Sequence, residues 1–544
     1  MMYPIAVTHQ QNKNLTIKLN PFAFWQTDLN IFNLCLQNNK HRLKYKKELM
    51  NKMFVKATCE EVGISSKKVL EYIKTLESYN LKTHSIIMAR GNKIFAETYY
   101  APFNKDFKHR MYSVSKSFVA IGVGLAEQEG LLSLDDKFMD YFPEYINENV
   151  NDRFFEATIK DMLSMQTFMV DYGIWWGKED RAKAYFTKSS RQIPGTNFFY
   201  DSSGSFLLGC LVEKVTKKPL LEYLKEKVLI DIGFSKDSYC LIAPGGHSHS
   251  DSGVMCTSRD LLIFARLLMN KGEYNGKRYI NEKFMTDVIS KQTETNCTDI
   301  ISPYDSHGYG YFVWKMPRDG FALFGMANQY AICDTKTDFI FIINSENMDN
   351  NSTSKTGTTI ILHELYKTII NNLDSPLSEN KEDAKELEDY LSTRKLICLE
   401  GETKSPILNK INGVKYVTEP NPMGIEYIKI DINDEKGIME YKNKDGINKL
   451  EFGMGYNVFS KFPGKKRMSI IASVYEDGQY DCATSAIWNE ENKLHILSQI
   501  IDTYMGSLFI ALGFKDDRVS ISMHKHSQRI LDEYSGYAIG KKEI

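Results

Sequence analysis

The sequence predicts an α+β protein in which helices flank an antiparallel sheet, with a helical insertion and a separate all-β region behind it. Three features of the 544-residue chain indicate this fold. Strand patterns occur near residues 84–99 and return at 308–345, and mostly helical sequence, about 113–300, separates them. Strands from both ends of such a region can share one sheet. Beyond about residue 400, short alternating segments between Gly and Asn/Asp turns are typical of an antiparallel sandwich or barrel.

The first predicted elements are a helix and a β-hairpin. Lys67 to Ser78 carries apolar residues at helical spacing. His84–Ala89 and Lys93–Tyr99 have strand patterns, and Arg90-Gly91-Asn92 between them predicts a turn. A helix then begins at Ser113. The later strand patterns are Gly308–Met316, Ala322–Asp334 and Asp338–Ser345, followed by a helix that includes Ile361, Leu365 and Ile369.

These elements divide the chain into four regions. We expect an N-terminal extension (1–56), a main domain (57–372), a linker with a solvated helix (373–399) and a C-terminal β-domain (400–544). The linker prediction depends on Ser-Pro-Leu-Ser followed by a run of Lys, Glu and Asp.

Composition argues for a soluble cytoplasmic protein. Hydrophobic residues make up 42% of the chain and charged residues 25%, an ordinary globular balance. Lys and Arg total 68 against 69 Asp and Glu, so neither nucleic acid nor an anionic membrane is expected as a partner. No apolar run approaches the ~18 residues of a membrane span, and the N-terminus lacks a secretory signal. The nine cysteines are scattered without a CxxC pair, which fits reduced thiols. The oligomeric state is left open.

The chemistry begins with a Ser-x-x-Lys spacing. Serine is a poor nucleophile until a nearby base removes its proton. At the start of a helix this spacing places both side chains one turn apart on one face, with the serine near the positive helix end. Among the Ser-x-x-Lys matches, only Ser113 with Lys116 follows a hairpin and opens an apolar helix; the alternative is an ordinary N-cap serine. The other matches begin at Ser65, Ser352, Ser378, Ser392 and Ser522.

The residues around Ser113 resemble a known family. MYSVSKSFVAIGVGLAEQEGLLSLDDKFMDYFPEY, from Met111 to Tyr145, is similar to the nucleophile region of the serine β-lactamase, DD-peptidase and carboxylesterase superfamily. The likeness is strongest to its class C β-lactamase-like and 6-aminohexanoate-oligomer-hydrolase-like branches. It continues through Glu60–Ser65, the Pro194-Gly195 turn and Gly308–Trp314, and so covers about residues 57–370.

This resemblance implies a fold and roles for several residues. We expect a β-lactamase/DD-peptidase-like fold for the main domain, with Ser113 as nucleophile and Lys116 as its proton acceptor. No metal or organic cofactor is implied. The C-terminal region loosely resembles the lipocalin-like β-barrels that are appended to some members.

The family's second element, Tyr-x-Asn, corresponds here to Tyr200-Asp201-Ser202. By resemblance, Tyr200 is the phenol that relays protons between the serine, Lys116 and the leaving group; the alternative is a buried core tyrosine. Ser202 replaces the usual asparagine. Because a hydroxyl is shorter than a carboxamide and cannot both donate and accept at the same reach, this change argues against β-lactam hydrolysis.

The third element is normally Lys-Thr-Gly or His-x-Gly on a strand beside the serine. Lys355-Thr356-Gly357 matches literally, but it leads directly into the last helix of the domain, so we reject it. The better match is Gly325 to Gln329. By resemblance, the N–H of Met326 completes an oxyanion hole with the N–H of Ser113. Asn328 replaces a glycine and no cationic side chain is present, which argues against recognition of a substrate carboxylate.

Further residues are candidates for lining the substrate site, beside Ser202 and Gln329. Gly245 to Asp251 contains two histidines and an aspartate, but such a loop seldom binds metal without another ligand placed elsewhere. The family has a Gly-rich wall of its cleft here, so we favour a substrate-lining role for His247. Trp175 either lines an apolar pocket or packs inside the helical insertion.

Together these features predict a serine hydrolase that acts on small esters or amides through a Ser113 acyl-enzyme. A β-lactamase and a D-aminopeptidase-type amidase are the enzymatic alternatives. A non-catalytic ligand-binding protein with the penicillin-binding fold is the alternative of another class.

Overall fold

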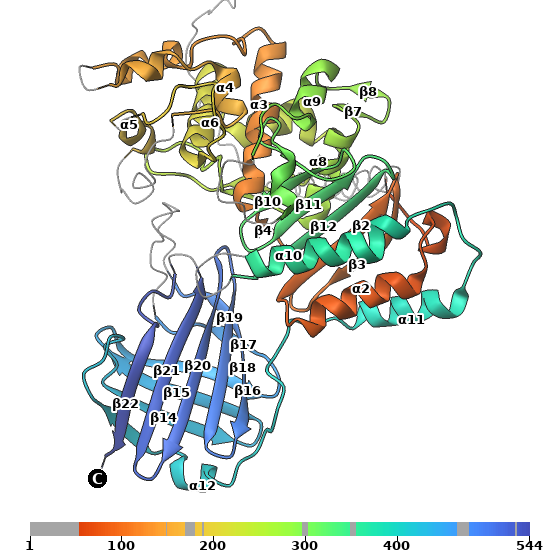
Figure 1. Ribbon diagram of the computed structural model, residues 1–544. Coiled ribbons are helices and arrows are strands. Elements are labelled where there is room, and N and C mark those ends of the chain that lie inside the picture. The colour runs from red at the N-terminus through yellow and green to blue at the C-terminus, as the bar shows by residue number, and fades with distance from the viewer. Residues whose placement is uncertain are drawn as a thin grey trace, which may run out of the picture. The chain divides into compact units, whose positions relative to one another are not determined.

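The computed structural model describes residues 54–147, 150–168, 180–187, 190–295, 303–348, 355–464, 478–527 and 530–543 (Figure 1). By its internal contacts the chain divides into Met1–Met53 and Phe54–Ile544, and the first of these units lies outside the described residues. The predicted N-terminal extension is therefore described only at its end, where Val55–Lys56 forms a short strand.

The main domain contains a seven-stranded sheet in the order β1-β3-β2-β12-β11-β10-β9. Its central strands are largely apolar because both faces of the sheet are covered, and every residue of β12 is buried. Antiparallel pairing of β2 with β12, for example Ile87 opposite Ile342, joins the two ends of the domain in one sheet. This confirms the predicted fold class. The strands are β1 (Val55–Lys56), β2 (Thr83–Arg90), β3 (Lys93–Tyr99), β9 (Trp314–Lys315), β10 (Phe321–Gly325), β11 (Gln329–Asp334) and β12 (Phe339–Ser345).

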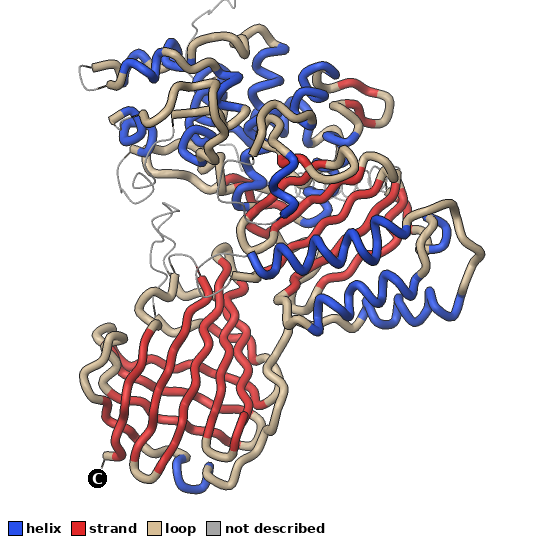
Figure 2. The backbone as a smooth tube through the Cα atoms, in the orientation of Figure 1, coloured by secondary structure: helices blue, strands red, loops and turns tan. Residues whose placement is uncertain are grey.

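Helices cover both faces of this sheet (Figures 1 and 2). On one face the ring of Tyr72 from α2 packs edge-on against Phe341 of β12, with ring centroids 5.7 Å apart. On the other face Ser258 of α8 donates to Asn344 of β12 at 2.7 Å. The helices of the first face are α2 (Ser66–Ser78), α10 (Lys355–Glu364) with its continuation Leu365–Ile369, and α11 (Lys381–Ser392); α8 (Ser258–Met269) covers the second.

Between β3 and β9 the described chain is mainly helical. Its centre is α3 (Ser115–Gln128), in which twelve consecutive residues, Ser115 to Ala126, are buried. Around it lie α4 (Ile159–Leu163), α5 (Arg181–Phe186), α6 (Ser202–Thr216), α7 (Leu220–Leu224) and α9 (Glu282–Ile289). The short strands of this region are β4 (His109–Arg110), β5 (Tyr239–Cys240), β6 (Val254–Cys256), β7 (Glu273–Tyr274) and β8 (Lys277–Arg278).

The C-terminal region is a β-barrel. Its strands alternate between exposed and buried positions, as in β15, and the buried side chains form one apolar core. Among the described residues nine strands close the barrel, because β16 pairs with β18 in parallel, and β17 is added to β18. This confirms the predicted all-β region. The short helix α12 (Leu408–Ile411) precedes β13 (Lys415–Thr418), β14 (Tyr427–Asn433), β15 (Lys436–Asn443), β16 (Gly446–Met454), β17 (Val458–Lys461), β18 (Asp481–Glu490), β19 (Lys493–Ile501), β20 (Met505–Lys515), β21 (Arg518–Ser527) and β22 (Gly536–Lys542).

None of the helices in the described residues is both long enough and apolar enough to cross a bilayer.

Candidate active site

Ser113 lies in a tight turn, Tyr112–Val114, that runs directly into α3. Tyr112 has a φ of 46°, a left-handed conformation that costs free energy in any residue with a side chain. Tyr112 is nevertheless buried, so the surrounding packing imposes this turn. Ser113 itself is only half-buried.

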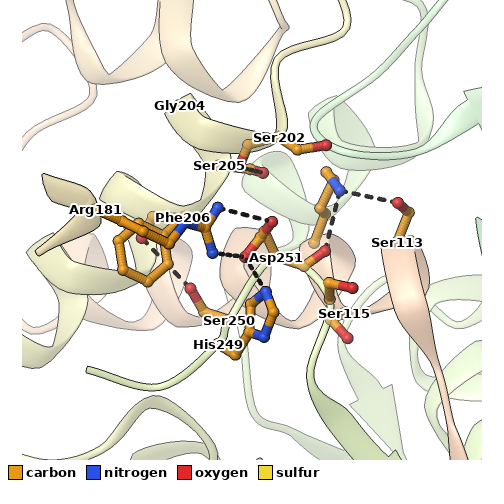
Figure 3. Close-up of polar contacts among 12 residues, drawn as sticks. Ser113, Ser115, Arg181, Ser202, Gly204, Ser205, Phe206, His249, Ser250 and Asp251 are labelled. Carbon is orange, nitrogen blue, oxygen red and sulfur yellow. Dashed lines mark hydrogen bonds and ion pairs between the residues drawn. The ribbon is translucent and has the colours of Figure 1, made fainter. Parts of the chain in front are cut away.

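Lys116 lies one helical turn after Ser113 and is fully buried. Its Nζ is 2.9 Å from Ser113 Oγ and donates to the carbonyl oxygen of Asp251 at 3.0 Å (Figure 3). Burial lowers the pKa of Lys116 to about 8, against the opposing effect of the Asp251 and Asp201 carboxylates. An amine with such a pKa is partly unprotonated near neutral pH and can accept a proton from serine.

Tyr200 lies close to Lys116, although the two residues are far apart in the sequence. Its ring centroid is 5.1 Å from Lys116 Nζ, and its ring stacks on Trp314 with centroids 5.7 Å apart. The next residue, Asp201, caps α6 by accepting from the N–H of Gly204, and Ser202 is the first residue of that helix. The structure therefore brings Tyr200 together with Ser113 and Lys116.

The end of β10 lies beside the turn that carries Ser113. A Cβ atom on Gly325 would be 2.3 Å from the carbonyl oxygen of Met111, so only glycine allows this approach. Met326 follows directly and is thus held next to the nucleophile turn. Gln329 is fully buried, and its Nε2 donates to the carbonyl oxygen of Ser345 at 2.6 Å. Gln329 therefore supports the turn from inside, whereas we expected it to line the substrate site.

The rejected Lys355-Thr356-Gly357 lies at the start of α10, with Lys355 exposed. Asn328, which stands where the family has a glycine, is buried. It donates to Tyr330 Oη at 2.8 Å and to Thr358 Oγ1 at 2.9 Å. The side chain of Asn328 thus joins the turn after β10 to α10.

A buried ion pair beneath Lys116 was missed by the sequence analysis. Arg181 Nη1 and Nη2 lie 3.1 and 3.3 Å from the two carboxylate oxygens of Asp251, and both side chains are buried (Figure 3). Burial by itself raises the pKa of Asp251, but the opposing effect of its positive neighbours, that of Arg181 first, outweighs burial and lowers that pKa to about 2. His249 Nε2 is 3.5 Å from Asp251, and burial lowers the pKa of His249, so its ring is neutral.

The loop that contains His249 and Asp251 had been considered as a metal site or a substrate-lining wall. In the part of the chain that the structure describes, no three His, Cys, Asp or Glu side chains are grouped to hold a metal ion. No sequence signal marks Arg181, which is 70 residues from Asp251.

His247 lies elsewhere. Its Nδ1 is 2.9 Å from Glu213 Oε2, and hydrogen bonding to that carboxylate raises the pKa of His247. It lines a pocket of about 440 Å³ together with Glu144, Glu213, Lys214 and others, and this pocket does not include Ser113, Lys116 or Tyr200. A substrate-lining role for His247 stays a prediction. Trp175 lies outside the described residues.

Residues 71–366 match the family model described as Beta-lactamase. The chain is 25% identical over 281 residues to the 6-aminohexanoate-dimer hydrolase of Paenarthrobacter ureafaciens, covering 48% of this chain and 71% of that protein. It is 22% identical over 147 residues to penicillin-binding protein 4* of Bacillus subtilis (strain 168), covering 25% and 31%. The octameric penicillin-binding protein homologue from Pyrococcus abyssi is a similar solved structure, with a TM-score of 0.44, 14% identity and coverage of 87% and 99%.

Proposed function

Because the chain belongs to the beta-lactamase family, we propose that it is a serine hydrolase of small ester or amide substrates that forms an acyl-enzyme on Ser113. The observation that carries this proposal is the 2.9 Å contact between Ser113 Oγ and the buried Nζ of Lys116. Burial holds the pKa of that amine at about 8, so the base is available where the nucleophile needs it. The similarity to a protein named 6-aminohexanoate-dimer hydrolase supports hydrolysis as the reaction class.

In the acylation step Lys116, assisted by Tyr200, takes the hydroxyl proton of Ser113 while Oγ bonds to the substrate carbonyl carbon. The N–H groups of Ser113 and Met326 stabilise the resulting oxyanion. The bond to the leaving group then breaks, and Tyr200 delivers the proton to the departing oxygen or nitrogen. In the second step water, deprotonated by the same pair, attacks the acyl carbon, and Ser113 leaves with a proton restored.

The test is covalent labelling with a fluorophosphonate, with the adduct mapped by mass spectrometry. We expect the adduct on Ser113, and none on Ser113→Ala. Ser65→Ala is the matched control. Ser65 has the same spacing to Lys68, but its side chain caps α2 by accepting from the backbone N–H of Lys68. This variant should label like the wild type. Absence of an adduct on Ser113 would favour a non-catalytic ligand-binding protein.

The substrate class is tested by a hydrolysis screen over acyl esters, D-amino-acid amides and a chromogenic cephalosporin. We expect turnover of esters or amides that falls on the order of 10³-fold or more in Ser113→Ala. Fast turnover of the cephalosporin would instead identify a β-lactamase. Turnover that survives in Ser113→Ala would contradict the acyl-enzyme proposal.

A further inference from the structure

We propose that Arg181 and Asp251 are positioning residues for Lys116: their buried ion pair fixes the carbonyl group that orients the Lys116 amine toward Ser113. The inference rests on the proposed function, since it assigns roles within the same site. This role accounts for a buried charged pair that takes no direct part in the proposed reaction.

The orientation of the Lys116 amine depends on its two polar contacts. A neutral amine has two N–H donors and one lone pair. Nζ donates to the carbonyl oxygen of Asp251 at 3.0 Å and lies 2.9 Å from Ser113 Oγ. With one N–H directed at Asp251, the lone pair can face the serine hydroxyl. The position of the Asp251 carbonyl therefore decides whether Lys116 can act as a base.

The side chain of Asp251 is held by Arg181. Both carboxylate oxygens of Asp251 contact the guanidinium of Arg181, at 3.1 and 3.3 Å (Figure 3). Arg181 opens α5, and its guanidinium lies 4.1 Å from the ring centroid of Phe206 in α6. A two-point contact of this kind fixes orientation as well as distance. The ion pair thus attaches the Asp251 loop to two helices.

The residues on either side of Asp251 are also fixed. Arg110 Nε donates to the carbonyl oxygen of Ser252 at 2.9 Å, and its Nη2 donates to Ser252 Oγ at 3.2 Å. A Cβ atom on Gly209 of α6 would be 2.0 Å from Ser250 Oγ, so α6 packs directly on the loop. With both neighbours held, the Arg181 contact determines how Asp251 itself is turned.

Asp251 and Arg181 also affect the pKa of Lys116. The Asp251 carboxylate favours the charged form of Lys116 and raises its pKa, whereas the Arg181 guanidinium disfavours that form and lowers it. The two charges thus act on the Lys116 pKa in opposite directions, at a site where burial is the largest influence. The charged and titratable groups that face Lys116 are Asp251, Arg181, Asp201, Tyr200, His249 and Ser113.

The test follows the rate of fluorophosphonate labelling against pH and its midpoint, the pH of half-maximal rate. Asp251→Asn should move the labelling midpoint to lower pH and Arg181→Met should move it to higher pH, each by about one unit. In both variants the plateau rate should fall by about tenfold or more, because the carbonyl loses its anchor. A purely structural role would not move the midpoint in opposite directions. Equal midpoints in the wild type and both variants, or shifts in one direction, would overturn the inference.

Arg318 and Asp334 provide a matched control. Their Nε–Oδ1 distance is 2.9 Å and Asp334 is buried, but Asp334 is the last residue of β11 and takes no part in the site. Asp334→Asn should be less stable than the wild type and keep its labelling midpoint; a shifted midpoint would overturn the inference.

If a single variant at the site fails to fold, the double variant Arg181→Met/Asp251→Asn removes both charges. It should keep the midpoint within about half a unit and lose plateau rate; an unchanged plateau rate would overturn the inference. A wild type that does not label at all would instead contradict the proposed function.

Discussion

At the scale of single residues, the reactivity of Ser113 depends on the protonation of Lys116. Burial lowers the pKa of Lys116 to about 8, and only the neutral amine accepts a proton. Labelling of Ser113 should therefore rise with pH, with a midpoint near 8, and be about 100-fold slower at pH 6 than at its plateau. The measurement is the second-order labelling rate between about pH 5.5 and 9.5.

Lys116→Arg is the control for this pH dependence. A guanidinium stays charged over the whole range, so this variant should label slowly and without a midpoint. A wild-type midpoint near pH 10, as for an exposed lysine, would contradict the argument from burial.

Gly325 gives a second prediction at this scale. Because a Cβ atom there would be 2.3 Å from Met111 O, Gly325→Ala must displace the turn that presents the Met326 N–H. We expect kcat to fall by about 10²-fold, the usual effect of losing one oxyanion donor. Gly513→Ala on β20 is the control, since no atom of a non-neighbouring described residue lies within 4 Å of the added methyl group. Equal kcat values in the two variants would show that the β10 turn does not serve the oxyanion.

The residues that sequence reasoning found and missed differ in how local their signal is. Ser113 and Lys116 are separated by three positions across the turn that leads into α3, so their spacing predicts their contact. The contact of Asp251 with Arg181 spans 70 positions and leaves no pattern in either segment. The need for glycine at position 325 is equally hidden, because the atom that excludes a side chain belongs to Met111.

At the scale of elements, the start of α6 depends on Asp201. Its carboxylate accepts from the N–H of Gly204 at 2.9 Å, from Thr167 Oγ1 at 2.9 Å and from Tyr185 Oη at 2.6 Å. Replacement by alanine uncaps the helix and removes the carboxylate that accepts from two buried hydroxyls. Asp201→Ala should lower the free energy of unfolding by about 2–4 kcal/mol, measured by urea denaturation.

Turnover of Asp201→Ala should fall as well, because Tyr200 and Ser202 flank the cap. Tyr185→Phe removes only one of the three contacts and leaves the Asp201 carboxylate with its other donors. This variant should lower the free energy of unfolding by about 1 kcal/mol. Similar losses of stability in the two variants would indicate that the cap contributes little.

The sheet shows which elements a sequence pattern can define. The apolar runs of β2 and β12 are long, and the sequence predicts both to within a residue or two. The predicted stretch Ala322–Asp334 is instead two strands, β10 and β11. The turn between them places Ala327 and Asn328 at φ values of 62° and 67°, and alanine is not a residue that marks such a turn.

At the scale of the whole molecule, the residue pattern of the C-terminal region fits a sandwich or a barrel, and only the loose resemblance to lipocalin-like domains favoured the barrel that the structure has. Alternating residues show which side of a strand is buried, and they do so equally in both architectures. The barrel is closed by parallel pairing of Gly453 and Met454 with Ser485 and Ala486. These partners lie about 30 residues apart and carry no turn or repeat that would predict the pairing.

The stability of the whole chain should depend on buried histidines. Among the described residues His84, His109 and His249 are buried, and burial lowers the pKa of each, that of His109 to about 3. In the unfolded chain a histidine has a pKa near 6.5 and takes up a proton below that pH. The folded chain cannot, so each of these groups lowers the free energy of unfolding as pH falls below about 6.5. His247 has a raised pKa and acts in the opposite direction.

His109 is suited to this test, because its two ring nitrogens have no hydrogen-bond partner among the described residues and its ring packs against those of Phe103 and Phe107. His109→Phe keeps an aromatic ring there and removes one titrating group. The gain in the free energy of unfolding over the wild type should be about 2 kcal/mol larger at pH 5 than at pH 7.5, because His109 no longer takes up a proton on unfolding. Removing His109 also raises the pKa of the neighbouring His84, which acts in the same direction. Urea unfolding at the two pH values gives this difference directly. If the variant changes stability equally at both, His109 is protonated in the folded chain and its burial does not hold it neutral.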